Sequence, residues 1–250
     1  MKIKIFLVLV FLANGALASS SDSEHPKQMN WSFDGYDGTV DRQSAQRGFQ
    51  VYKEVCSSCH SLKLKSYRNL ADIGFSEEEV KAIAAGDTVI DGPNDAGDMF
   101  ERAGRPSDRF VAPFANDNAA RASNNGAFPP DLSLIIKART DGANYLYSLL
   151  TGYENAPEHF ELGNGMSYNS YFPGRQIAMP SPLFDGSVEY QDGTSASVDQ
   201  MSKDVVNFLQ WAAEPEMEQR KQMGVKVFLY LLVFTVLFYL AKKRIWKNVK

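Results

Sequence analysis

Cysteine is nearly absent from this 250-residue chain. It has two cysteines, at positions 56 and 59. One disulfide is the most that two cysteines can form, so a disulfide-stapled scaffold is excluded. Histidine is also scarce, with three residues. A structural zinc site of four ligands would have to recruit His25 or His159 to complete Cys56, Cys59 and His60. This scarcity argues against zinc.

Other patterns are missing as well. No alternation of strands and helices surrounds residue 56, and this disfavours a thioredoxin-like redox pair, which opens a helix after a strand. Internal repeats and low-complexity segments are absent too. The central part of the chain is therefore interpreted as one domain.

The two cysteines stand in "VCSSCHSL", residues 55–62, with the spacing C-x-x-C-H. This spacing is typical of covalent c-type haem attachment, and the remaining alternative is a disulfide, or two buried thiols, beside a bystander histidine. Thioether bonds from Cys56 and Cys59 would fix the macrocycle and place His60 on the iron as the proximal ligand. The other ring nitrogen of His60 should donate to a backbone carbonyl, which we expect in the rigid segment "FPPDL", residues 128–132.

The N-terminus has the features of a secretory signal peptide. Lys2 and Lys4 precede an apolar run over residues 5–12, and Ala16-Leu17-Ala18 is a cleavage site of the small-x-small type. The run is too short for a membrane span, which takes about 20 residues. We expect residues 1–18 to be removed after Ala18.

A second apolar segment lies near the C-terminus and is long enough to span a membrane. Residues 224–245 are predicted to form one transmembrane helix, in which Lys226 can snorkel to the interface. The tail that follows, residues 246–250, and the end of the helix are strongly basic, which predicts a cytoplasmic C-terminus. Residues 19–223 would then form a haem domain in the periplasm.

This outer domain is more acidic than the whole chain. Setting aside the eight basic residues of the two apolar ends changes the formal net charge from −4 to −12 for residues 19–223. A negative field disfavours nucleic acid and favours a basic protein partner. The densest acidic stretch is predicted to be a loop, and a solvated surface is the alternative to partner docking for its candidate residues: Asp91, Asp95, Asp98 and Glu101.

Capping and periodicity predict short helices. One should begin after Asp41 and run to Cys56, and another should begin after Ser76 and end at Gly86. Two more are expected over residues 131–140 and 143–152, followed by a last one after Ser197. Residues 154–195 are rich in Gly, Pro, Asn and aromatics, which suits a loop that bears a ligand.

The sixth iron ligand is expected from this loop. Met166 and Met179 are its methionines, and His159 is a further candidate. The proline after Met179 stiffens the segment, and a stiff segment holds a weak thioether better than a mobile one. The residues alone therefore favour Met179 over Met166.

Several segments together closely resemble the cytochrome c1 family. They include "VYKEVCSSCHSL", "ARASNNGAFPPDLSLIIKAR", "YNSYFPGRQIAMPSPL" and "DVVNFLQWAAEPEMEQRKQMG", and the likeness covers nearly the whole mature chain. The resemblance implies that Met179 is the sixth ligand and that Arg139 and Tyr145 lie at the haem propionates. It also implies that the wall of the haem pocket includes Asn124, Ala127, Pro129 and Pro130. Some bacterial members have an extra disulfide near the ligand loop, and this chain has no cysteine for it.

The resemblance implies a function and a fold. The expected fold is mainly α, a class I cytochrome c-like haem domain with long loop insertions and one C-terminal transmembrane helix. The chain would take electrons from a Rieske iron–sulfur subunit beside cytochrome b and reduce a c-type cytochrome, in a bacterial inner membrane. It would not be an enzyme by itself, because the quinol chemistry belongs to other subunits. A stand-alone membrane-anchored cytochrome that donates to a terminal oxidase is the alternative.

Overall fold

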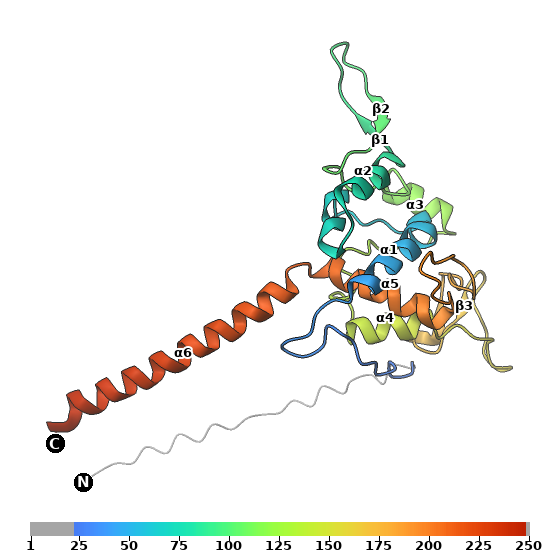
Figure 1. Cartoon of the computed structure of the whole chain (residues 1–250). Coiled ribbons are helices and arrows are strands. Elements are labelled where there is room, and N and C mark those ends of the chain that lie inside the picture. Colours follow the sequence, from blue (N-terminus) through green and yellow to red (C-terminus); the bar gives the residue numbers. More distant parts are fainter. Residues whose placement is uncertain (1–22, 249–250) are drawn as a thin grey trace, which may run out of the picture.

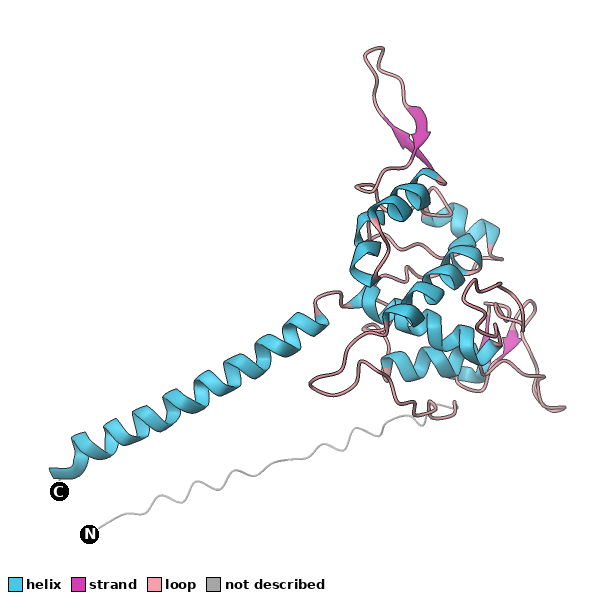
Figure 2. Cartoon of the chain, viewed as in Figure 1, coloured by secondary structure: helices cyan, strands magenta, loops and turns pink. Residues whose placement is uncertain are grey.

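The computed structural model of this protein describes residues 23–248. The expected signal peptide, residues 1–18, lies outside the described residues. Helices dominate the fold, and one long helix, α6, extends away from the domain that holds the others (Figures 1 and 2). The described helices and strands are α1 Arg42–Glu54, η1 Cys56–Ser58, η2 Tyr67–Ile73, α2 Glu77–Ala85, β1 Thr88–Asp91, β2 Phe100–Ala103, α3 Asp117–Ser123, α4 Gly142–Leu150, β3 Ser167–Tyr168, η3 Pro173–Arg175, β4 Gln176–Ile177, α5 Val198–Ala213, α6 Met217–Ile245 and η4 Trp246–Asn248.

The expected helix starts at Asp41, Ser76 and Ser197 are confirmed. Each of these side chains accepts a hydrogen bond from a backbone N–H in the first turn of α1, α2 or α5. Ser76 also forms a reciprocal capping box with Glu79. Such caps satisfy donors that the helix itself leaves unpaired, so local sequence was sufficient to locate these helix starts.

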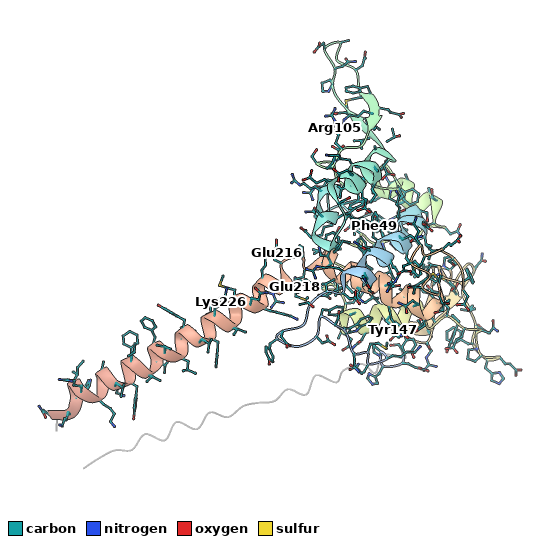
Figure 3. All side chains as sticks on the ribbon, in the orientation of Figure 1. Phe49, Arg105, Tyr147, Glu216, Glu218 and Lys226 are labelled. Atoms are coloured by element: carbon teal, nitrogen blue, oxygen red, sulfur yellow. The ribbon has the colours of Figure 1, made fainter. Side chains whose placement is uncertain are left out.

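Helices α1 and α5 cross at the centre of the domain and form its core (Figure 1). Gly48 allows the close approach, because a Cβ at this position would lie 1.9 Å from the Asp204 carbonyl oxygen. The Phe208 ring packs 5.7 Å from that of Phe49, which is labelled in Figure 3, and 5.6 Å from that of Tyr52. This contact fixes the end of α1, from which the cysteine motif continues.

A buried carboxylate joins the same two helices. Asp204 is fully buried and accepts hydrogen bonds from Ser44 Oγ at 2.7 Å and from Arg47 Nε and Nη2, each at 3.0 Å. These bonds, chiefly the hydrogen bond with Asp204, raise the pKa of Arg47, while burial opposes the shift. The Arg47 guanidinium is therefore charged, and its two hydrogen bonds to Asp204 hold α1 against α5.

We expect Asp204→Ala to lower the free energy of unfolding by about 3 kcal/mol, because Arg47 would lose its buried partner and keep only the exposed Asp192 at 3.0 Å. Chemical denaturation of the haem-loaded, detergent-solubilised protein measures this change. Glu77→Ala is the control, since it removes an exposed pair with Lys81 at 3.8 Å and should cost less than about 1 kcal/mol. Equal losses in both variants would contradict the structural role of Asp204.

The prediction of a helix over residues 131–140 is wrong. This segment forms a series of turns, and Gly142, which was expected to end it, is the first residue of α4. The carboxylate of Asp131 binds the backbone N–H of Ser133, and Asp141 adopts a left-handed conformation with φ of 60°. Both features interrupt regular helical hydrogen bonding. The following helix, α4, is confirmed.

The acidic stretch is not simply a loop. Strands β1 and β2 form an antiparallel hairpin with Thr88 opposite Ala103 and Asp91 opposite Phe100. The hairpin projects from the domain beside α2 (Figures 1 and 2). The side chain of Asn94 accepts hydrogen bonds from the backbone of Ala96 and Asp98 and so orders the tip.

Helix α6 is continuous from the domain into the apolar segment, and Figure 3 shows side chains pointing outward along its apolar part. It is the one helix within residues 23–248 that is long and apolar enough to cross a membrane. Its first turns are tied to the domain: Glu218 pairs with Arg42 at 2.8 Å, and Lys221 Nζ donates to the carbonyl oxygens of Phe33 and Gly38. The boundary expected at residues 223 and 224 therefore falls within a helix.

Candidate functional site

The cysteine motif lies at the end of α1, where the chain tightens into the 3-10 turn η1. The carbonyl oxygen of Cys56 accepts hydrogen bonds from Cys59 N at 3.1 Å and from His60 N at 2.8 Å. The two thiols are free and half-buried. Burial raises the pKa of Cys56 to about 12, so this thiol is neutral at physiological pH. The disulfide alternative is therefore absent from the described structure.

The His60 ring is held through one nitrogen. Its Nδ1 lies 2.8 Å from the carbonyl oxygen of Pro130, which confirms the expectation that the acceptor lies in residues 128–132. This bond makes Nδ1 the protonated nitrogen and leaves Nε2 with its lone pair. Burial lowers the pKa of His60, although the bond to Pro130 opposes the shift, and the imidazole is thus neutral. A neutral ring oriented in this way can bind a metal through Nε2.

Asp131 fixes the segment that carries the Pro130 carbonyl, a role that the sequence analysis missed. Its Oδ2 accepts from Ser61 Oγ and Lys63 N, each at 2.8 Å, and its Oδ1 accepts from Ser133 N at 2.9 Å. Burial works against ionisation of Asp131, but these bonds outweigh it and hold the pKa of this carboxyl below its usual range. The only sequence signal was its place directly after Pro130. We call Cys56, Cys59, His60, Pro130 and Asp131 the proximal group.

A second set of residues is linked to Met179 through Tyr153. The Tyr153 hydroxyl donates to the Met179 carbonyl oxygen at 3.1 Å. Burial raises the pKa of Tyr153, with a smaller electrostatic contribution from the nearby Tyr145. Burial also raises the pKa of Tyr145, and the nearby Arg139 opposes this shift. We call Arg139, Tyr145, Tyr153 and Met179 the distal group; Tyr153 was not predicted from the sequence.

Arg139 and Tyr145, both predicted from the sequence, differ in how far their side chains are exposed. The Arg139 side chain is exposed, and its Nη1 donates only to the carbonyl oxygen of the neighbouring Ala138. Tyr145 is half-buried on α4 and packs against the same core as Cys56. The core thus connects the distal group to the proximal group.

The other residues expected in the pocket wall are Asn124, Ala127 and Pro129. Asn124 uses its side-chain amide to donate to Ala120 O at the end of α3. Ala127 and Pro129 are half-buried in the segment that leads to Pro130. Nothing in these contacts assigns the three residues to a ligand, and their place in a pocket wall remains a proposal.

The rival iron ligands lie in less suitable surroundings. His25 and His159 are exposed. Met166 lies in a turn and packs against Gly163, with its Cγ 3.1 Å from where a Cβ on that residue would lie. Among residues 23–248 no group of three or more His, Cys, Asp or Glu side chains forms a metal cluster.

The chemistry of the proximal group fits a covalently bound haem. It provides two free thiols, spaced by two residues on one turn, and a neutral imidazole whose Nε2 is available. A haem held there would supply an iron that cycles between Fe(III) and Fe(II). The fold and this donor set define a c-type cytochrome with a single candidate membrane anchor in the described chain.

Comparison with known proteins identifies the kind of c-type cytochrome. Residues 31–249 match the family model described as "Cytochrome C1 family". The chain is 52% identical to "Cytochrome c1 1, heme protein, mitochondrial" of Arabidopsis thaliana, over 90% of this chain and 74% of that protein. It is 45% identical to "Cytochrome c1" of Rhodospirillum rubrum, over 97% and 95% of the two chains, and 48% identical to "Cytochrome b/c1" of Bradyrhizobium diazoefficiens, over 92% and 37%.

The chain belongs to the cytochrome c1 family. It therefore carries a c-type haem, transfers electrons and is the haem subunit of a cytochrome bc1 complex. The mainly helical haem domain with one C-terminal membrane helix is confirmed. A stand-alone cytochrome that donates to a terminal oxidase is not favoured.

Proposed function

We propose that this subunit accepts one electron at a time from a Rieske iron–sulfur protein and passes it to a c-type cytochrome, within a ubiquinol:cytochrome c oxidoreductase. The observation that carries the proposal is the His60 imidazole, held by Pro130 and facing the site beside two free thiols. Neither step needs a nucleophile or a general acid. The chain's part is to hold the haem and set its potential.

The residues expected to hold the haem have the following tasks in this proposal. Cys56 and Cys59 would form the thioether bonds, and His60 and Met179 would bind the iron. His/Met ligation raises the potential relative to most other axial pairs. Arg139 and Tyr145 donate to the haem propionates, where a guanidinium makes charge-assisted hydrogen bonds. Asn124, Ala127, Pro129 and Pro130 line the pocket.

We also propose the orientation in the membrane. The basic residues at the end of α6 favour a cytoplasmic C-terminus, and this places residues 19–223 in the periplasm of a bacterial inner membrane. Residues 224–245 would form the span, and residues 246–250 the tail. The net charge of the outer domain disfavours binding of nucleic acid.

Purification after mild detergent extraction tests the assignment of partners. A tag on this chain should bring down cytochrome b and a Rieske protein, and the isolated assembly should reduce a c-type cytochrome with ubiquinol. Recovery of the chain with a terminal oxidase, and without cytochrome b, would contradict the proposal.

The structure narrows the surface proposed to meet the acceptor. Asp91 was a candidate docking residue, but its carboxylate is paired with Arg102, which also binds Asp108. Asp95, Asp98 and Glu101 are exposed on the projecting hairpin and have no ion-pair partner among the described residues. These three carboxylates are the better candidates for steering a basic cytochrome.

We expect the triple variant Asp95→Asn, Asp98→Asn, Glu101→Gln to slow reduction of a basic c-type cytochrome roughly threefold or more at low ionic strength, because steering raises association rates. The difference should fade near 0.15 M salt, where the Debye length is about 8 Å. Stopped-flow rates across a salt titration measure it.

The control makes the same change of charge away from the hairpin. Its substitutions are Glu24→Gln, Asp37→Asn and Glu189→Gln, at exposed positions outside the hairpin. Equal slowing in both triple variants would mean that net charge alone, and not the hairpin, attracts the acceptor. Unchanged rates in both would leave the hairpin a solvated surface.

A further inference from the structure

Several contacts attach the segment that carries Met179 to the domain, and two of them bear on the position of the Met179 backbone. It belongs to the long stretch after α4 that we call the ligand loop, residues 154–184. A cavity of about 630 Å³ lies between the end of α4 and this loop, lined in part by Leu150, Tyr168 and Leu183. Because a cavity lies beneath the loop, individual hydrogen bonds matter more for its position than they would in a closely packed core.

One attachment point is the base of the loop. The fully buried Asn169 donates through Nδ2 to Leu149 O at 2.8 Å, in the last turn of α4, and its Oδ1 accepts from Tyr171 N at 3.1 Å. Asn169 also pairs with Tyr153 in an isolated antiparallel bridge. The Tyr153 backbone is thus fixed where α4 ends.

The other attachment point is the tip of the Tyr153 side chain. Its hydroxyl donates a hydrogen bond to the Met179 carbonyl oxygen at 3.1 Å, and the two residues are 26 positions apart in the sequence. Strand β4 pairs with β3 and ends at Ile177, two residues before Met179, so the ladder stops short of the methionine. Tyr153 is the residue that continues the attachment beyond the end of this ladder.

We propose that Tyr153 is a positioning residue for the iron ligand: its hydroxyl holds the Met179 backbone so that the flexible thioether stays directed at the iron. The inference rests on the proposed ligation by Met179. A methionine side chain has three rotatable bonds, so a fixed backbone reduces the number of orientations in which sulfur is off the metal. Tyr153 acts through Met179 and needs no contact with the iron.

The variant Tyr153→Phe keeps the ring and removes the hydroxyl. We expect the ferric haem of the full-length, detergent-solubilised protein to bind added imidazole roughly three- to tenfold more tightly, as the loss of one hydrogen bond implies. The absorption band between methionine sulfur and ferric iron should weaken as well. Tyr171→Phe is the control, because this tyrosine lies in the same loop and contacts Gly152 rather than Met179.

A double-variant cycle separates positioning from a general loss of structure. In a Met179→Leu background the sixth ligand is already gone, so Tyr153→Phe should no longer change imidazole affinity. An equal increase in both backgrounds, or no difference between Tyr153→Phe and Tyr171→Phe, would overturn the inference. Absence of the sulfur-to-iron band from the wild-type protein would instead overturn the proposed ligation by Met179.

Discussion

In the double variant Cys56→Ala, Cys59→Ala, we expect no haem to remain with the polypeptide after denaturation. These are the chain's only cysteines, so the two proposed thioether bonds would be its only covalent links of this kind to the haem. Haem staining of a denaturing gel, together with extraction into acid acetone, measures the loss. The wild-type band should keep its haem under both treatments.

Single substitutions provide the graded comparison. Cys56→Ala and Cys59→Ala should each retain haem through the remaining thioether, in a reduced amount. Ser58→Ala is a matched control, because it lies between the cysteines and its hydroxyl donates only to Val55 O and weakly to Cys59 Sγ. If wild-type haem extracts freely into acid acetone, the covalent attachment is wrong.

Replacement of Met179 by Leu should produce the second large effect. The thioether favours Fe(II), so its removal should lower the reduction potential by a substantial part of the roughly 0.8 V that axial ligation covers among haem proteins. The sulfur-to-iron absorption band should disappear from the ferric spectrum. Potentiometric titration of the detergent-solubilised protein measures the shift.

Met166→Leu is the control for this experiment. Met166 lies in the same loop, but its side chain folds back against Gly163, and we expect its replacement to leave the potential nearly unchanged. A large shift in Met166→Leu with none in Met179→Leu would reassign the ligand. A shift in neither would point to His159 as the remaining candidate from the loop.

Local sequence predicted the features that depend on neighbouring residues. The caps at Asp41, Ser76 and Ser197 and the carbonyl acceptor for His60 follow from side chains a few positions apart or from a rigid segment. The hairpin could also have been found, because Thr88, Val89 and Ile90 favour a strand and Gly and Asn favour the turn that follows.

Features that depend on distant contacts were missed for a physical reason. The helix expected over residues 131–140 has helical periodicity, but Asp131 is engaged with Ser61 and Lys63, some 70 residues earlier. The bond from Tyr153 to Met179 likewise depends on how the ligand loop folds over its cavity. Neither interaction has a local signal, since each is fixed by tertiary structure.

The unbroken helix α6 has a mechanical consequence. Met217, in its first turn, is buried in the domain, and Glu218 and Lys221 bind the segment that precedes α1. Because the helix has no break, a tilt or rotation of its apolar part is passed on to its first turns, which are bound to the domain. The height and the heading of the haem above the lipid surface are therefore set by the same helix that spans it. Between Met217 and Ile245 the helix has no break at which the haem domain could turn relative to the apolar segment.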